Sequence, residues 1–163
     1  MYKSLSVKTR LGREERRKTM NWKAEAKEKL RCYDAMRLAT INIPEEIQRL
    51  EIDFQSIRSA RSDATPVSGG GNKREEAILN NLIHRQELAW TLQQAQSWLK
   101  TTDRALTALN NEEKLILHRL FIYPERGAIS RLSSELGVDS SVVYRRCEKA
   151  LKHFTLAYYG INE

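Results

Sequence analysis

The sequence RLSSELGVDSSVVYRRCEKALK, residues 131–152, contains two apolar helical patterns separated by a glycine. Ser133 is small where two helix backbones must approach, and Gly137 stands at the turn, where a positive φ is wanted. Four side chains supply apolar contacts between steeply crossed helices: Leu132, Leu136, Val138 and Val143. This spacing predicts a helix-turn-helix. A tight helical corner without a ligand is the alternative, since helical bundles also use Leu/Gly turns.

The second helix of this unit is expected over residues 140–159, with Gly160 as its stop. Asp139 is expected to cap it by accepting a hydrogen bond from an early backbone amide. The inner face repeats at helical spacing and consists of Val143, Cys147, Ala150, Leu151 and Phe154. The opposite face is therefore predicted to be exposed.

In a DNA-bound interpretation, this helix enters the major groove with its N-terminus first. The side chains expected at the base edges are Ser140, Ser141, Tyr144 and Arg145. Arg146 and Lys149 flank them toward phosphate, and Arg145 is the candidate for a bidentate contact to guanine. The start of the preceding helix, near Arg126 and Gly127, is expected to meet backbone phosphate through free amides.

The segment before this unit predicts one further helix. Asn110 and Glu113 have the spacing of a capping box. The helix that follows is expected to bury Leu115, Ile116, Leu120 and Phe121. Residues 123–127, which include Pro124, predict a break before a helix over 128–136.

The middle of the chain predicts an antiparallel helical hairpin. Pro44 is expected to start its first helix, because proline suits a first helical position. Steps of three and four residues link Ile47, Leu50, Phe54 and Ile57, a pattern that predicts packing against another long helix. Residues 59–73 predict a Gly/Ser/Pro loop, and a second helix is expected over 73–104. Trp90 and Trp98 widen its apolar stripe and are predicted to be core side chains rather than base-stacking platforms.

The formal charge of +7 arises at the N-terminus. Residues 1–31 contain eleven Lys/Arg and four Asp/Glu, and the remainder is neutral. A helix is expected over 13–40. The one-signed excess favours a basic arm that neutralises phosphates, with Arg13, Arg16, Arg17 and Lys18 among its members. A solvated helix face with intrahelical ion pairs is the alternative.

Composition limits the remaining functions. Cys32 and Cys147 are far apart and have no metal-like neighbours, a pattern that fits a reduced, cytoplasmic protein. We expect no metal site and no cofactor, because the histidines lack ligand spacing and the glycine run at 69–71 lacks a P-loop lysine. No apolar run suggests a membrane span. No constellation of residues suggests an enzyme.

We therefore predict an all-α chain in three parts. Residues 1–43 form a basic N-terminal arm or helix, residues 44–108 form the helical hairpin, and residues 109–163 form the helix-turn-helix domain.

Residues 109–154 resemble region 4 of sigma-70-type transcription factors, most clearly in LGV and in VYRRCEKAL. The wider layout is similar to a family of small phage-encoded regulators of late, packaging, lysis or autolysin genes. The resemblance implies a phage or prophage activator that binds double-stranded DNA in the bacterial cytoplasm, at the nucleoid, and acts with host RNA polymerase. No aromatic-rich region for capturing a melted strand is found in residues 1–108, so promoter opening is expected to need the host sigma factor.

Two departures affect this resemblance. Arg146 stands where such motifs usually carry an apolar residue, and Cys147 is expected to take over its packing role. Pro124 lies where a glycine-containing connection is usual. Other functions stay open: a small terminase-like packaging protein that binds DNA and assembles into a ring, or a module that docks on RNA polymerase. The sequence does not identify the operator. It also leaves open whether the chain forms a homodimer and whether it activates or represses transcription.

Overall fold

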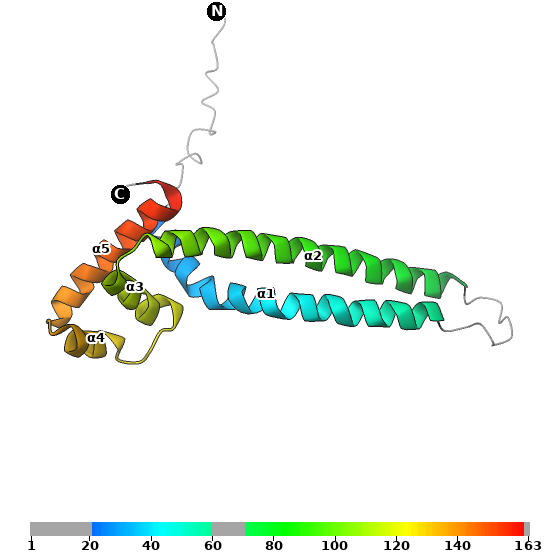
Figure 1. Cartoon of the computed structure of the whole chain (residues 1–163), viewed down its shortest axis with the longest axis horizontal. Coiled ribbons are helices and arrows are strands. Elements are labelled where there is room, and N and C mark those ends of the chain that lie inside the picture. Colours follow the sequence, from blue (N-terminus) through cyan, green and yellow to red (C-terminus); the bar gives the residue numbers. More distant parts are fainter. Residues whose placement is uncertain (1–20, 60–70, 162–163) are drawn as a thin grey trace, which may run out of the picture.

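The computed structural model describes residues 21–59 and 71–161. Within them the chain is all-α, with five α-helices in the order α1 (Trp22–Ser59), α2 (Gly71–Thr107), α3 (Asn111–Leu117), α4 (Ala128–Leu136) and α5 (Ser140–Tyr159). A π-helical turn, η2 (His118–Ile122), continues α3. Figure 1 shows α1 and α2 as a long antiparallel pair that extends away from a head formed by the shorter helices. The predicted hairpin is confirmed. No helix in the described ranges is long and apolar enough to cross a membrane.

The α1–α2 pair is held by a seam of side chains with 3.5-residue spacing. On α1 the seam consists of Met36, Thr40, Ile43, Ile47, Leu50, Phe54 and Ile57, all half-buried. On α2 it consists of Ile78, Asn81, Arg85, Leu88, Leu92, Ala95 and Leu99. The amide nitrogen of Asn81 donates to the carbonyl oxygen of Leu50 at 2.8 Å, which fixes the register of the two helices. The predicted α1 pattern is confirmed and extends to Met36, eight residues before Pro44.

The expected helix boundary at Pro44 is wrong, because α1 runs through it without interruption. Proline removes one backbone hydrogen bond and crowds the carbonyl four residues earlier, at a cost of about 3 kcal/mol. Ile43 and Ile47 continue the seam on both sides of Pro44. Packing of a long apolar face therefore overrides the local preference. The proline ring itself is exposed, so it displaces no seam residue.

The first helix was expected over 13–40; α1 begins at Trp22 and ends at Ser59, and residues 13–20 lie outside the described residues. Asn21 is outside the helix, and its side-chain oxygen accepts the backbone amide of Ala24 at 2.9 Å. Asparagine is a favoured N-cap because this bond satisfies a free amide of the first turn. The arm residues Arg13, Arg16, Arg17 and Lys18 and most of the loop at 59–73 lie outside the described residues.

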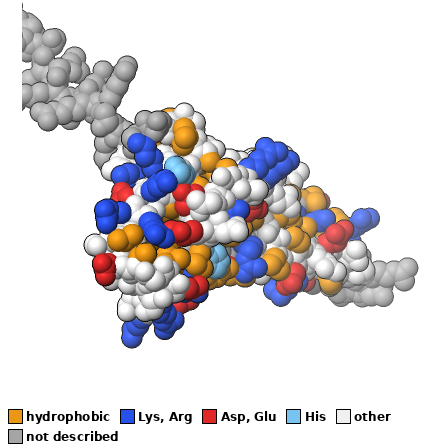
Figure 2. Space-filling model, turned by 60° about the vertical axis from the view of Figure 1, so that its left-hand side comes forward, with side chains coloured by type: hydrophobic (Ala, Val, Ile, Leu, Met, Phe, Trp, Pro, Cys, Tyr) orange, Lys and Arg blue, Asp and Glu red, His pale blue; other side chains and the backbone are white. Residues whose placement is uncertain are grey.

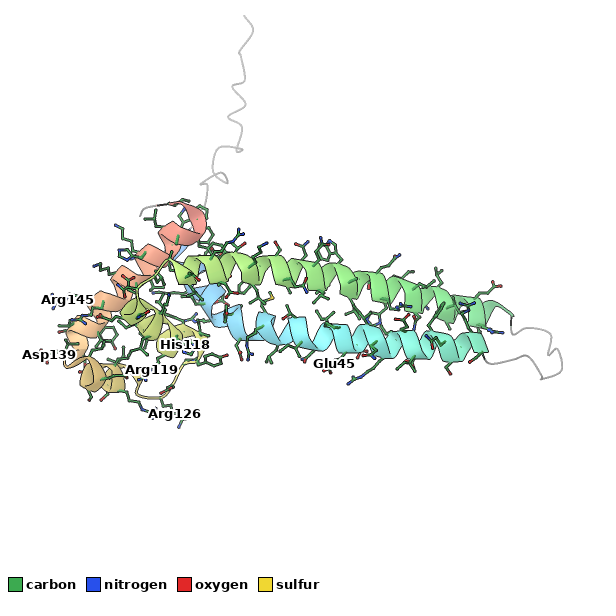
Figure 3. The ribbon with its side chains drawn as sticks, viewed as in Figure 1. Glu45, His118, Arg119, Arg126, Asp139 and Arg145 are labelled. Carbon is green, nitrogen blue, oxygen red and sulfur yellow. The ribbon has the colours of Figure 1, made fainter. Side chains whose placement is uncertain are left out.

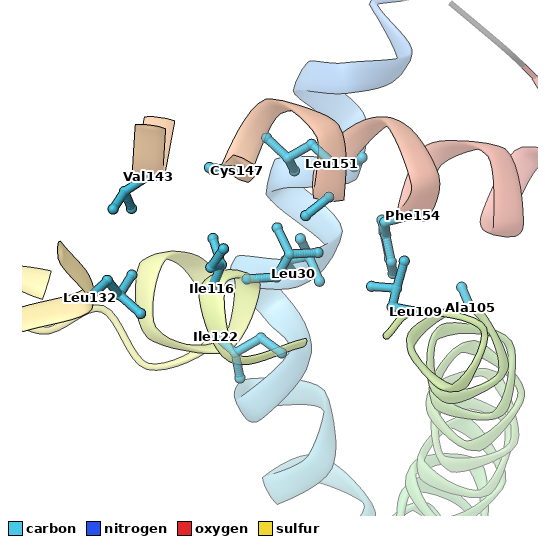
Figure 4. Close-up of a cluster of buried hydrophobic side chains, with 13 residues drawn as sticks. Leu30, Ala105, Leu109, Ile116, Ile122, Leu132, Val143, Cys147, Leu151 and Phe154 are labelled. Atoms are coloured by element: carbon cyan, nitrogen blue, oxygen red, sulfur yellow. The ribbon is translucent and has the colours of Figure 1, made fainter. Parts of the chain in front are cut away.

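The core of the head includes side chains from the hairpin helices as well as from the shorter helices. It takes side chains from every helix: Ala26, Leu30, Ala105, Leu109, Ile116, Leu117, Ile122, Leu132, Val143, Cys147, Ala150, Leu151 and Phe154. Leu30 of α1 has 0% exposure and lies at the centre, between α5 and the α3–η2 segment (Figure 4). The first turns of α1, predicted to belong to a basic arm, are therefore part of the head. The five residues predicted for the inner face of α5 are all buried, as expected.

Aromatic and polar contacts tie the same junction together. The hydroxyl of Tyr33 on α1 donates to Asp103 on α2 at 2.7 Å. Burial, then this hydrogen bond, raises the pKa of Tyr33 to about 12. The rings of Trp22 and Tyr159 lie 4.8 Å apart, centroid to centroid, which joins the start of α1 to the end of α5.

The segment between α3 and α4 departs from the prediction in detail. The capping box is confirmed, with Glu113 N donating to Asn110 Oδ1 at 2.8 Å and Asn110 N donating to Glu113 Oε2 at 3.2 Å. The helix then widens into η2, where Tyr123 N donates to His118 O at 2.8 Å. Pro124 cannot continue the helix. Of the residues expected in this core, only Ile116 is fully buried, while Leu115, Leu120 and Phe121 are half-buried.

The core prediction for Trp90 is wrong. Its side chain is 64% exposed, on the side of α2 that faces away from α1. Trp98 is half-buried, and Lys29 of α1 lies over its ring at 5.7 Å. The broad apolar stripe of α2 is in fact two stripes, one facing α1 and the other facing solvent.

We expect Leu30→Ala to lower the free energy of unfolding by about 2–5 kcal/mol, because it opens a cavity in the core of the head. Leu38→Ala, on the same helix but 43% exposed, is the matched control and should change it by less than about 0.5 kcal/mol. Urea denaturation followed by circular dichroism measures both. Equal losses in the two variants would contradict a central role for Leu30.

Candidate nucleic-acid interface

The corner between α4 and α5 is set by its turn residues. Gly137 has φ 63° and ψ 35°, a left-handed conformation that side-chain-bearing residues rarely adopt. The hydroxyl of Ser133 donates to the carbonyl of Val138 at 2.5 Å, and the Val138 amide donates to the Ser133 carbonyl at 3.1 Å. The predicted bounds of both helices and the positive φ at Gly137 are confirmed.

Asp139 precedes α5 in extended backbone geometry but does not cap it through its side chain. Its backbone carbonyl instead accepts the amides of Val142 at 2.9 Å and Val143 at 3.1 Å. The predicted side-chain cap is therefore wrong. The carboxylate is left at the surface, next to the start of α5 (Figure 3).

The outward face of α5 carries the residues expected to read bases. Ser140, Ser141, Tyr144 and Arg145 are all exposed, Tyr144 by 59%. Figure 3 shows Arg145 projecting from α5 on the side away from the hairpin. Within the described part of the chain, Arg145 has no hydrogen-bond or ion-pair partner. Its guanidinium is therefore available to an external ligand.

Lys149 and Lys152 continue this row toward the C-terminus, and both are exposed. Ser141, Arg145, Lys149 and Lys152 share one helix face, over about 16 Å at a rise of about 1.5 Å per residue. Lys152 was missed in the sequence prediction. It could have been found there, because it lies opposite the buried stripe of Val143, Ala150 and Phe154.

Arg146 does not point freely toward phosphate. Its guanidinium donates to Glu112 of α3 at 2.7 Å, which ties α5 to the start of α3. The sequence placed Arg146 where an apolar residue is usual, and this ion pair is the structural reason that arginine is accommodated there. Cys147 takes the core position, as expected, and burial raises the pKa of its thiol to about 11.

The start of α4 differs from the expected phosphate site. Arg126 and Gly127 are both exposed, and Figure 3 shows Arg126 at the edge of the head beside α4. The Ala128 amide is not free, since it donates to the Glu125 carbonyl at 3.2 Å. The Glu125 carboxylate accepts the Arg131 side chain at 2.6 Å. The guanidinium of Arg126 is thus better placed than the Ala128 amide to meet an anion.

An acidic residue interrupts the basic face of α5. Glu148 lies beside Lys149 in sequence but accepts Lys23 of α1 at 2.8 Å, with Lys27 at 3.9 Å. The Lys23 hydrogen bond lowers the pKa of Glu148. These two lysines, expected to belong to a phosphate-binding segment, hold α1 against α5 instead. Figure 2 shows Lys and Arg side chains interspersed with Asp and Glu on the head.

The described residues were also searched for metal sites and for hollows that could hold a ligand. They contain no group of three or more His, Cys, Asp or Glu side chains that could hold a metal ion. A hollow of about 640 Å³ lies on the hairpin, where Thr40, Leu99, Lys100 and Asp103 contribute to its lining. Comparisons of the chain with protein-family models, curated proteins and solved structures found no match.

The Lys23–Glu148 contact should give stability a measurable pH dependence. Because the pKa of Glu148 is lowered by folding, the contact stabilises the protein above the ordinary glutamate pKa, and this contribution is lost as the pH falls through the folded value. Glu148→Gln should lower the free energy of unfolding by less than about 1 kcal/mol at pH 7, since both groups are half-exposed. Once the pH is below the folded pKa of Glu148, the variant and wild type should be equally stable.

Urea denaturation of both proteins across this pH range checks the linkage. A difference that persists unchanged at low pH would show that position 148 acts through packing rather than through charge.

Proposed function

We propose that the chain is a sequence-specific DNA-binding protein that presents α5 to the major groove. The observation that carries the proposal is the row of Ser141, Arg145, Lys149 and Lys152 on one exposed helix face. Among the described residues, no acidic partner engages the three cations of this row. Other head cations are occupied, for example Arg119 with Glu135 and Arg146 with Glu112.

The dimensions of this face support the proposal. The major groove is about 12 Å wide and admits an α-helix. α5 crosses one end of the head and exposes its first turns beyond α3 (Figure 1). Arginine at an exposed helix position can make two parallel hydrogen bonds to guanine, and lysine can neutralise phosphate as a point charge. The hydroxyls of Ser140, Ser141 and Tyr144 can donate to or accept from bases and phosphate.

The biological role we propose is transcriptional regulation. The α3–α5 head carries the residues that resemble sigma-70 region 4, which favours a phage or prophage activator that acts with host RNA polymerase at the bacterial nucleoid. On this proposal the chain works by binding and not by catalysis. Arg126, at the start of α4, is assigned to the phosphate backbone, and Arg146 is assigned to the internal contact with Glu112.

The test begins by selecting a preferred duplex from a random-sequence pool with the full chain. Arg145→Ala should then bind this duplex about 5- to 150-fold more weakly and should lose preference at one or two base pairs. Arg49→Ala is the matched control, because Arg49 is an exposed arginine on the hairpin that pairs with Glu46. Its affinity should be unchanged. Fluorescence anisotropy measures both.

Lys149→Ala separates phosphate contact from base contact in the same assay. It should weaken binding to all duplexes alike and reduce the slope of log affinity against log salt by about 1. An unchanged affinity for Arg145→Ala, or an equal loss for Arg49→Ala, would overturn the proposed orientation of α5.

A further inference from the structure

The outer face of α2, directed away from α1, carries a second seam. Its members are Leu79, Ile83, Gln86, Trp90, Gln93 and Ser97, at steps of four and three residues, and all six are exposed. This is the spacing at which one helix packs along another. Trp90 is 64% exposed and Leu79 56%. A solvent-facing stripe that repeats in this way is typical of a helix interface, whereas single exposed apolar side chains need no explanation.

The six members of this stripe are uncharged, and Glu87 lies at its edge beside Trp90. The outer face of α1 has a comparable apolar content, with Leu38, Ile41 and Ile52, but Arg31 and Glu45 interrupt it. Figure 3 shows Glu45 on the side of α1 away from α2. Burying a charge is costly, so α2 is the better of the two faces for a helix partner. Its occupant must itself offer an apolar, uncharged helical stripe.

We propose that this occupant is a second copy of the chain and that two α2 helices pair through their outer faces in an antiparallel, two-fold arrangement. One register pairs the two most exposed apolar members of the stripe with each other. With the two-fold axis between His84 and Arg85, Trp90 of each copy packs on Leu79 of the other, and Ile83 packs on Gln86. Such a contact is self-complementary and closes after two subunits.

This register gives the dimer a definite shape. The C-terminal end of α2 lies about 34 Å from the axis at about 1.5 Å per residue. The two heads therefore stand about 68 Å apart at opposite ends, where they do not obstruct each other. A parallel pairing would instead place Gln86 against Gln86 in the middle of the interface and bring both heads to one end.

The contact is short, which determines its strength. Stable interfaces bury about 800 Å² on each partner, and four side-chain layers of one helix bury less. We therefore expect a reversible dimer with a dissociation constant on the order of micromolar.

Sedimentation velocity of the full chain from about 1 to about 200 µM tests the proposal across this affinity range. Wild type should shift from monomer to dimer, and Trp90→Glu should weaken the dimer by at least about tenfold, because each interface would bury two carboxylates. Ile52→Glu is the matched control, because Ile52 is 60% exposed on the outer face of α1. The dissociation constant of this variant's dimer should equal that of wild type. Circular dichroism melting confirms that both variants fold.

A wild-type monomer throughout this range, equal loss in Ile52→Glu, or a ring of several subunits would each overturn the proposal. The register has its own test in a Cys32→Ser background, where a short bismaleimide should join Leu79→Cys to Trp90→Cys when the two variants are mixed. Cross-linking of Trp90→Cys to itself in preference would overturn the antiparallel arrangement. None of these results depends on DNA binding.

Discussion

The insertion of Leu30 into the head is the interaction on which the rest of the structure depends. Leu30 is fully buried, and the core around it includes Ile116 of α3, Ile122 of η2 and Leu151 of α5. Helices as short as α3 and α4 have little stability of their own, since most helical stability in proteins comes from packing. The first turns of α1 therefore contribute to the core of the head, and the rest of α1 forms one helix of the hairpin.

This arrangement has a consequence for the candidate interface. α1 packs against one flank of α5, where Lys23 reaches Glu148 and Trp22 meets Tyr159. α3 engages the other flank through Arg146 and Glu112. The face between these flanks, with Arg145 near its centre, is left exposed. The same contacts that anchor α5 thus select which of its cations are available to a ligand.

Local patterns in the sequence predicted local structure well. The bounds of α4 and α5, the Gly137 turn, the Gly160 stop and the capping box at Asn110 each follow from a few adjacent residues. The errors arose where packing against distant parts of the chain decides the local structure. Pro44 usually marks a helix start, but the seam with α2 carries α1 through it.

The candidate site shows the same division. Helical phase correctly predicted which residues of α5 are exposed and that the opposite stripe is buried. The exposed residues are Ser140, Ser141, Tyr144, Arg145 and Lys149. It could not show that Arg146 pairs with Glu112, which is 34 residues away, or that Lys23 and Lys27 pair with Glu148. Trp90 was misplaced because one broad stripe on a helix cannot be separated into two faces without knowing which side its partner occupies.

Site-specific photo-cross-linking most directly tests the claim that the outward face of α5 contacts DNA. A benzophenone amino acid replaces Ser141 on α5 or, as the control, Gln55 on the hairpin, and each protein is irradiated with its selected duplex. Efficient cross-linking is expected from position 141, mapped to bases inside the selected site, and none from position 55. Cross-linking from position 55 alone, or from neither position while the duplex is bound, would contradict it.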